Sequence, residues 1–386
     1  PVGSSVSVRV WTLDEVGNAS ALSNAATVWV SPFTLARLDG PSSDAGTGIS
    51  GTLDRFGDAH AAYTAGTAAQ ELRYLKRTGG AWGAAEAPDP GAPAADPAMA
   101  VDNGGLPQIV YRNPQTGQLR HARRAGFWTA GTIAAGNLIP GGLALDATGL
   151  AHVSYYDAAA GDLRYARFDG AAWQLEAVDT AGAVGRFSSL ALDAAAKPGV
   201  AYYDSSNAPL KFSSRSAAGV WSGSVVDFAV DVGSTPVLAL DADGRALIAY
   251  VDSGGKTLKT AAWNGSAWTV STLDSFASSG SVGGLALDGA GRPQLSYYDA
   301  SAGDLRFASG TVDSFADAGR DSELLLEASG GLTLLYYDAS NGDLKSAVWA
   351  AGLPPAMGGN PRGRLQAPAT FTGIVASSTT IQWTWT

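Results

Sequence analysis

Seven copies of one unit, each of about 45 residues, make up most of this chain. In the clearest copy an apolar run ends at Asp146, and a glycine, a Tyr-Tyr-Asp run, a Gly-Asp-Leu-Arg turn and Trp173 follow in that order. Four short strand-like runs per copy, at this period, are typical of a β-propeller blade and not of a helical solenoid. The acidic residue that opens the first turn recurs at Asp54, Asp102, Asp146, Asp193, Asp241, Asp288 and Glu327.

The copy at residues 142–188 predicts where the strands of one blade lie. An apolar run of small residues at 142–145 fits the crowded axis of a ring, and Asp146-Ala147-Thr148-Gly149 has the composition of a turn. Residues 151–156 are apolar or aromatic on both faces, as expected for a strand buried between two neighbouring blades. The third and fourth strands are expected at 163–168 and 173–178, joined through Asp-Gly, which favours a hairpin.

The two ends of the repeat region predict how the ring closes. The seventh copy loses its pattern after its third strand, near Trp349. The missing fourth strand matches residues 33–39, which align with residues 268–274 almost position for position. We therefore predict an all-β fold, a seven-bladed β-propeller over residues 32–352, in which residues 33–39 complete the last blade and leave no open edge.

Short segments flank the repeats on both sides. Residues 1–31 hold two strand-like runs that resemble the last two strands of a fibronectin type III domain, and residues 367–386 resemble the first two. Neither segment has enough strands for a sandwich. We expect partial fibronectin type III-like β-sandwich strands at both ends, a Gly- and Pro-rich linker at 353–366, and a longer string of modules around this chain.

Composition excludes several classes of partner and site. The formal net charge is −10, with 25 basic and 35 acidic residues, which argues against nucleic acid as a partner. No apolar run is long enough to insert into a membrane as a helix. Cysteine is absent, so neither a disulfide framework nor a thiolate metal site can form. We expect no cofactor.

The blade pattern, with its Tyr-Tyr-Asp strand end, Gly-Asp-Leu-Arg turn and trailing Asp-Gly and Trp, resembles bacterial repeat proteins that form seven-bladed propellers. More loosely, it is similar to fucose-binding propeller lectins, whose repeats place an aromatic residue, a basic residue and a tryptophan around each pocket between blades. The resemblance covers residues 33 to about 350 and implies ligand sites at the rim between blades. Those lectins also pair the basic residue with a glutamate, and no glutamate recurs here.

A basic residue follows the leucine of the third strand in every copy. These residues either form a ring of cations that binds hydroxylated or acidic ligands, or pair with the turn acid of their own hairpin. The tyrosine pairs and tryptophans either stack on sugar rings or fill the space between blades. The basic residues are Arg73, Arg120, Arg164, Lys211, Lys259, Arg306 and Lys345. The predicted ligand-binding residues are Arg120, Arg164, Arg306, Tyr156, Tyr298, Trp128 and Trp173.

Two of the acidic turns have the spacing Asp-x-Ser-x-Gly-Asp, which favours a hard cation such as calcium. They lack the third carboxylate and the terminal glutamate of an EF-hand loop, and an aspartate that opens a turn normally binds its own backbone. The calcium candidates are Asp299, Asp304, Asp338 and Asp343, and no other metal site is expected.

The sequence gives little support for catalysis. His60 and His152 occupy the same position in their blades, and His121 stands where other copies have tyrosine or phenylalanine, so all three fit a packing pattern. No nucleophile elbow, phosphate loop or pair of histidines at metal-binding spacing occurs. We therefore predict that the protein is not an enzyme.

We expect a non-catalytic binding or assembly module of a large secreted or cell-surface bacterial protein, used for adhesion or as a structural element. Its partners would be other protein modules of the same or neighbouring chains, including copies of itself in a homopolymer, or glycans. A glycan-binding propeller lectin is the alternative. A glycoside-active propeller enzyme is the third reading, and an asymmetrically placed acid pair in the central pocket would favour it.

Overall fold

The structure is a computed structural model that describes two terminal strand pairs and a large ring of sheets. The described residues are 5–8, 26–29, 33–40, 44–67, 70–229, 231–241, 243–277, 279–288, 291–307, 310–315, 317–327, 329–349, 372–377 and 380–384. Of residues 5–8, 26–29, 372–377 and 380–384, only the backbone is described. Contacts divide the chain into two units, residues 34–357 and residues 1–33 with 358–386.

Seven antiparallel four-stranded sheets form the larger unit. The first is β4 (Ala45–Leu53), β5 (Ala59–Ala65), β6 (Glu71–Thr78), β7 (Ala81–Trp82), and the second is β8 (Ala95–Val101), β9 (Pro107–Arg112), β10 (Leu119–Ala125), β11 (Phe127–Ala134). The third is β12 (Leu138–Leu145), β13 (Ala151–Asp157), β14 (Asp162–Phe168), β15 (Trp173–Asp179), and the fourth is β16 (Val184–Leu192), β17 (Pro198–Asp204), β18 (Leu210–Arg215), β19 (Trp221–Asp227). The fifth is β20 (Val232–Leu240), β21 (Ala246–Asp252), β22 (Thr257–Trp263), β23 (Trp268–Ser275), and the sixth is β24 (Gly280–Leu287), β25 (Pro293–Asp299), β26 (Asp304–Phe307), β27 (Gly310–Asp313). The seventh is β28 (Ala318–Leu326), β29 (Leu332–Asp338), β30 (Asp343–Trp349) and β3 (Thr34–Asp39).

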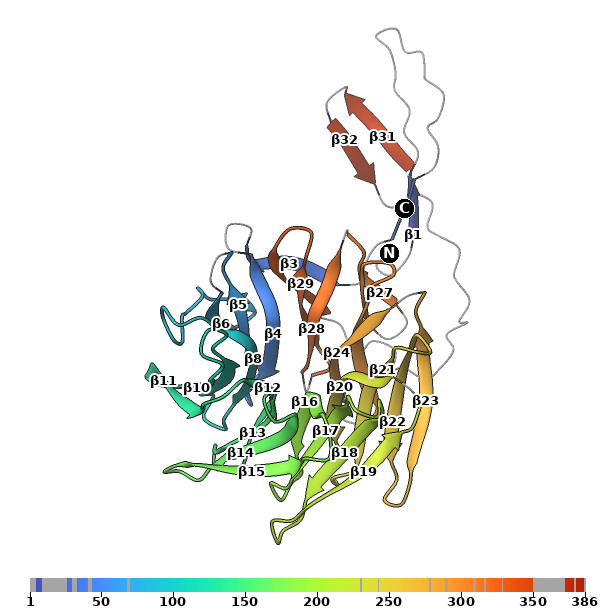
Figure 1. Cartoon of the computed structure of the whole chain (residues 1–386). Helices are drawn as coiled ribbons and strands as arrows, with labels where there is room; N and C mark the ends of the chain where they lie inside the picture. Colours follow the sequence, from blue (N-terminus) through green and yellow to red (C-terminus); the bar gives the residue numbers. More distant parts are fainter. Residues whose placement is uncertain are drawn as a thin grey trace. The chain divides into compact units, whose positions relative to one another are not determined.

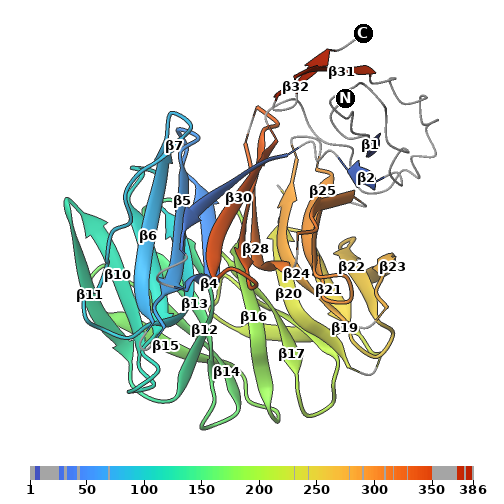
Figure 2. The ribbon, with the colours of Figure 1, turned by 90° about the horizontal axis from the view of Figure 1, so that it is seen from above.

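The sheets follow one another around a ring, each with its first strand innermost (Figure 1). Neighbouring innermost strands contact one another all the way round, and β28 of the seventh blade contacts β4 of the first. The outer strand of the seventh blade is β3, which precedes the first blade in the sequence. It pairs with β30 from Thr34↔Val348 to Asp39↔Leu344 (Figure 2). The predicted seven-bladed all-β propeller is confirmed.

The core lies between the blades. The second strand of each blade is buried on both faces, and in β5 all seven residues are buried. Such a strand needs apolar or aromatic side chains on both sides of the sheet. Close approach of the innermost strands explains their glycines: a Cβ on Gly284 would lie 2.4 Å from the backbone nitrogen of Leu324 in the next blade. Only glycine fits so short an approach.

The innermost strands are longer than the sequence predicted, because each continues through a β-bulge. The first strand of the third blade begins at Leu138, not near residue 142. In four other blades the bulge places a non-glycine residue in the left-handed region, with φ of +53° at Asp96, +53° at Phe187, +47° at Thr235 and +49° at Asp321. A bulge lets the strand continue while one residue leaves the ladder. The sequence did not show that the strand begins before residue 142, because bulge residues break the alternation of a strand.

By topology, the bulges, the turns from second to third strand and the crossings between blades all lie on one face of the ring. We call this the bulge face. The turns opened by the recurring acidic residues lie on the opposite face. Strained left-handed residues gather at functional sites in many proteins, so the bulge face is the natural place to search for one.

The terminal unit contains two separate strand pairs. β1 (Ser5–Val8) pairs with β2 (Ala26–Trp29), and β31 (Thr372–Ser377) pairs with β32 (Thr380–Thr384), both antiparallel. These two-stranded sheets do not amount to the fibronectin type III-like sandwich strands expected from the sequence. The expected linker at 353–366 lies outside the described residues.

Candidate functional site

A repeated polar network joins each blade to the one before it. The first tyrosine of the second strand donates its hydroxyl hydrogen to an aspartate at the end of the preceding blade's outer strand. In the fourth blade, Tyr202 donates to Asp179 over 2.8 Å, and Lys211 lies 2.5 Å from the same carboxylate. The same arrangement joins Tyr63 to Asp39, Tyr250 to Asp227, Tyr297 to Asp274 and Tyr336 to Asp313. Tyr111 donates to Asp89, which follows the outer strand β7 of the first blade.

Five of the seven third-strand cations also contact the aspartate of the preceding blade: Arg120, Lys211, Lys259, Arg306 and Lys345. Lys259 lies 3.5 Å from Asp227 of the preceding blade and 2.6 Å from Asp252 of its own blade. The pairing with the turn acid that the sequence offered as an alternative is therefore present. The terminal aspartates of the outer strands are the partners that sequence reasoning missed. Their signal was the apolar residue and aspartate that close the matched runs at residues 33–39 and 268–274.

A second set of contacts lies on the bulge face. The second tyrosine of the Tyr-Tyr-Asp run donates to an acid that precedes the innermost strand of the next blade. Tyr298 donates to Asp317 over 2.5 Å, and Arg320 binds the same carboxylate. Burial, together with the negative charge of Asp317, raises the pKa of Tyr298. The same contact joins Tyr203 to Asp231 and Tyr337 to Asp44.

An open depression of about 640 Å³ surrounds Tyr298. Its lining includes Tyr298, Asp317, Arg320 and the bulge residue Asp321, with Ser281 and Ser301. Asp321 also accepts a hydrogen bond from the Gly48 amide of the first blade over 3.1 Å. The depression thus offers a phenol, a guanidinium and two carboxylates at the boundary between the sixth and seventh blades.

The boundary between the third and fourth blades differs. Tyr156, Arg186 and Phe187 line a small pocket of about 70 Å³ there. Ala183 occupies the position of Asp317, so Tyr156 lacks the acid that its counterparts bind. Within the described part of the chain, no carboxylate lies within ion-pair distance of Arg186, whose guanidinium lies 5.7 Å from the Phe187 ring. Phe187 is 51% exposed.

The structure separates the predicted ligand-binding residues. Tyr156 and Tyr298 line the two pockets of the bulge face. Arg120 binds Asp89, Arg164 binds Asp157 and Asp162, and Arg306 binds Asp299. Trp128 donates to Glu86 over 2.7 Å, and Trp173 packs edge-on against His121 with ring centres 5.3 Å apart. The seven residues therefore do not form one repeated pocket.

The calcium candidates are engaged with cations and with their own turns. Asp299 binds Arg306, Asp338 binds Lys345, and Asp343 lies 4.0 Å from Arg37. The pKa of Asp304 is raised, first by burial. Across the residues that the structure describes, no group of three or more His, Asp or Glu side chains has the arrangement of a metal site.

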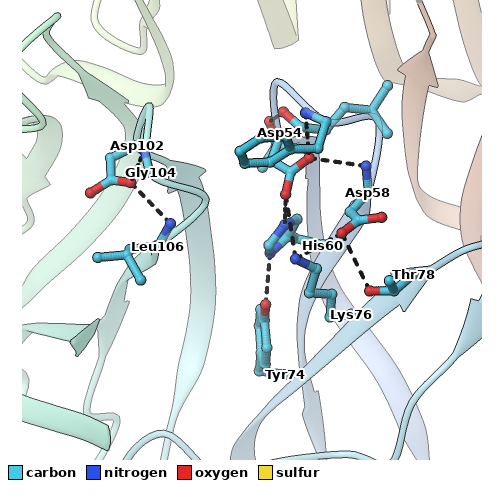
Figure 3. A network of polar contacts seen from close by, with 12 residues as sticks. Asp54, Asp58, His60, Tyr74, Lys76, Thr78, Asp102, Gly104 and Leu106 are labelled. Atoms are coloured by element: carbon cyan, nitrogen blue, oxygen red, sulfur yellow. Dashed lines mark hydrogen bonds and ion pairs between the residues drawn. The ribbon is translucent and has the colours of Figure 1, made fainter. Parts of the chain in front are cut away.

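The histidines lie in buried contacts away from the bulge face. Figure 3 shows His60 between Asp54 and Tyr74, with Nε2 3.1 Å from the carboxylate and Nδ1 2.7 Å from the phenol. Asp54 also accepts backbone hydrogen bonds within its turn. Burial lowers the pKa of His60, against the opposing effect of Asp54. Because His60 is fully buried, this relay stabilises the first blade and is closed to a substrate.

One acid has no counterpart in the other blades. Glu323 lies on innermost strand β28, two residues after Asp321, where the first and fourth blades have Ser50 and Ser189. Loss of hydration raises the pKa of Glu323 to about 8. Asp321 and Glu323 thus place two acids on β28, one of the seven innermost strands around the axis, and no other blade has an acid at the position of Glu323.

No protein-family model matches this chain, and no curated protein matches its sequence. The ring is nevertheless similar to solved propeller structures. A streptogramin B lyase is 13% identical with a TM-score of 0.56, over 82% of this chain and 97% of that one. An ulvan lyase is 13% identical with a TM-score of 0.53, over 80% and 92%. A protein of unknown function from Dyadobacter fermentans is 12% identical with a TM-score of 0.52, over 81% and 98%.

These similarities correct one prediction. We predicted from missing catalytic motifs that the protein is not an enzyme, but two of the three propellers are lyases. The motifs sought in the sequence were those of other folds, so their absence did not test for the chemistry that a propeller can host. At 12–13% identity the similarity itself establishes the fold alone. No helix in the described part of the chain is long and apolar enough to cross a membrane.

Proposed function

We propose that the bulge face binds an acidic, hydroxyl-rich ligand, with an acidic polysaccharide as the best chemical match, through Tyr156, Arg186 and Phe187. One observation carries the proposal. At the other boundaries where this tyrosine recurs, an aspartate of the next blade accepts its hydroxyl hydrogen, whereas Ala183 stands at that place here.

Each of the three side chains suits part of such a ligand. A guanidinium forms paired hydrogen bonds with a carboxylate or sulfate. An exposed aromatic ring packs on the apolar face of a sugar, and a phenol can donate to or accept from a hydroxyl group. Phe187 keeps its ring exposed while its backbone holds a left-handed conformation. Retaining a strained, exposed aromatic residue is easier to explain by binding than by folding.

The chain offers a matched control for the arginine. Arg186 and Arg320 occupy the same bulge position in β16 and β28, but Arg320 is held by Asp317. We expect Arg186→Gln to weaken binding of a polyuronate or a sulfated polysaccharide about 10- to 100-fold, from the loss of charge-assisted hydrogen bonds. Arg320→Gln should change it little.

Binding would be measured by biolayer interferometry, with a neutral glucan as the negative ligand and the melting temperature as a check of folding. Phe187→Ala should also weaken binding, without removing its dependence on salt. If Arg186→Gln binds as tightly as the wild type, or if Arg320→Gln loses as much, the proposal is wrong.

A lyase that cleaves an acidic polysaccharide by elimination is the second candidate. It would act in the depression at Tyr298 and Arg320. Elimination next to a carboxylate needs a cation that neutralises the carboxylate and a group that takes a proton, so the substrate carboxylate would have to displace Asp317 from Arg320. Glu323 lies three residues after Arg320 on β28 and is not among the residues that line the depression; its pKa of about 8 would suit proton transfer near neutral pH. The lyases among the similar propellers add weight to this candidate.

The two candidates give different results with the same variants. Elimination creates an unsaturated product that absorbs ultraviolet light, and Arg320→Gln and Glu323→Gln should abolish its formation while Arg186→Gln lowers binding. If polysaccharide binds and no product forms, the lyase candidate is wrong and the binding function stands. Product formed by the Glu323→Gln variant at the wild-type rate would remove Glu323 from the reaction.

The setting of the protein is also part of the proposal. We propose a module of a larger bacterial protein, secreted or displayed on the cell surface, that takes part in adhesion or assembly with protein modules of its own or neighbouring chains. The likeness of the repeats to bacterial propeller repeats, and of the terminal segments to fibronectin type III strands, supports this. Cell fractionation of the source organism with an antibody against the ring tests it: a signal confined to the cytosol would contradict it.

A further inference from the structure

We propose that the boundary between the second and third blades contains a carboxylate-binding site on the bulge face of the ring. At six of the seven boundaries an aspartate from the preceding blade accepts the hydroxyl hydrogen of the buried tyrosine. At the remaining boundary, between the second and third blades, Ala134 stands in place of the aspartate. Ala134 pairs with Leu119 in the second blade, just as Asp179 pairs with Leu163 and Asp227 with Leu210 in theirs.

The groups that would bind the missing carboxylate are all present. Tyr155 is 2% exposed, and no group in the described part of the chain hydrogen-bonds to its hydroxyl. Arg164 pairs with Tyr155 across β13 and β14, so both side chains point to the same face of the sheet. Arg164 is paired within its own blade, with Nε 3.3 Å from Asp157 and Nη2 2.9 Å from Asp162. No described side chain of the second blade makes an ion pair with its guanidinium.

The boundary between the fifth and sixth blades shows that these groups can hold another carboxylate. The sixth blade has the same set, with Tyr297, Arg306, Asp299 and Asp304 in place of Tyr155, Arg164, Asp157 and Asp162. There Asp274 of the preceding blade binds Tyr297 and lies 3.9 Å from Arg306, although two acids already surround the arginine. An identical set of neighbours thus accepts a third negative group.

The position is within reach of a dissolved ligand. The aspartates at the other boundaries have partly accessible side chains, from 3% exposed at Asp313 to 31% at Asp274. Alanine lacks the carboxylate that closes this position elsewhere, so the phenol and the guanidinium are left for a group from solution. A phenol without a protein partner, beside a guanidinium, favours an anionic group at this position.

The ligand is a carboxylate: either a small free acid or the uronate unit of a larger glycan. This site is independent of the function proposed above, because it lies on the other side of the third blade and shares none of Tyr156, Arg186 and Phe187. Its probes are sodium acetate and sodium glucuronate, each compared with sodium chloride at equal ionic strength. Binding of acetate alone would identify a small-acid site, and binding of both would identify a uronate site.

Two substitutions at one position test the site. Ala134→Asp supplies the carboxylate from within, so we expect a higher melting temperature and acetate binding at least about tenfold weaker than in the wild type. Ala134→Asn has nearly the same shape without the charge and should gain less. Asp274→Ala opens the equivalent position between the fifth and sixth blades and should create a second acetate-dependent rise in melting temperature.

Titration by ¹³C-acetate NMR and thermal melts would give both readouts. The proposal is overturned if wild type and Ala134→Asp bind acetate equally, or if Ala134→Asp melts no higher than Ala134→Asn. It is also overturned if Asp274→Ala responds to acetate while the wild type does not, because the natural position would then be closed. Arg186 is the other guanidinium proposed to bind a carboxylate, so the two sites are separated by comparing variants: acetate binding that is lost in Arg186→Gln and kept in Ala134→Asp belongs to the site of the proposed function and overturns this one.

Discussion

The contacts between blades can be tested at Asp227, which ends the outer strand of the fourth blade. Its carboxylate accepts hydrogen bonds from the Tyr250 hydroxyl over 2.7 Å and from the Ala229 amide over 3.0 Å. Asp227→Ala removes both acceptors and leaves a fully buried tyrosine hydroxyl without a partner. Lys259 keeps Asp252 at 2.6 Å, so no cation is abandoned.

The expected cost follows from these contacts. An unpartnered buried hydroxyl costs about 1–3 kcal/mol, and the lost turn hydrogen bond adds about 0.5–1.5 kcal/mol. We therefore expect Asp227→Ala to lower the free energy of unfolding by about 1.5–4.5 kcal/mol, measured by urea denaturation with an unchanged slope. In a double-mutant cycle, Tyr250→Phe combined with Asp227→Ala should cost less than the sum of the single changes, because both remove the same hydrogen bond.

Acid should weaken the same contact. Burial alone would raise the pKa of Asp227, but the hydrogen bonds from Ala229 and Tyr250 and the charge of Lys259 outweigh it and hold the pKa below its usual value. The stabilisation is therefore complete above the ordinary aspartate pKa of about 3.9 and is lost as the pH falls below it. Asp227→Asn should reduce this acid sensitivity.

Tyr155→Phe is the matched control, since Tyr155 has no aspartate to bind. We expect it to cost much less than Tyr250→Phe when both are measured without added carboxylate. A cost below about 0.5 kcal/mol for Asp227→Ala, within the range of ordinary surface substitutions, would refute the reasoning. Equal costs for the two tyrosine substitutions would do the same.

Three further predictions concern closure and buried titratable groups. Deleting residues 1–39 removes β3, exposes the edge of β30 and takes away the buried Phe33, so aggregation or a large fall in melting temperature is expected, and unchanged melting would contradict the closure. Burial lowers the pKa of His121 to about 4, so its contribution to stability is complete above the unfolded pKa of about 6.5 and declines towards pH 4; His121→Phe should flatten the stability profile in that window, and an unchanged profile would argue against a buried neutral histidine. Because the pKa of Glu323 is raised to about 8, ionisation penalises the folded state, and Glu323→Gln should gain stability relative to wild type as the pH rises from 4.5 to 8, whereas a constant difference would show that Glu323 is ionised throughout.

The positions of the repeated features could be predicted from sequence because every blade has the same neighbours. The turn acids, the doubly buried second strands and the match of residues 33–39 to residues 268–274 all depend on local composition or on repetition. The strands of the third blade begin and end within a residue or two of the expected positions, apart from β12. The bulge that lengthens β12 was missed because it breaks the alternation by which a strand is recognised.

The candidate sites could not be predicted in the same way, because they lie where the repetition fails and where two blades meet. Ala134 and Ala183 are ordinary residues in the sequence. They matter only because of their places in the structure. Ala134 stands where an aspartate accepts from a tyrosine at the six other boundaries, and Ala183 stands where an aspartate does so at three others. The sequence by itself determined the number of blades, their strands and the closing strand, since those depend on local pattern. Tertiary structure decided which side chains are left without partners, because a partner in a propeller comes from the neighbouring blade, tens of residues away along the chain.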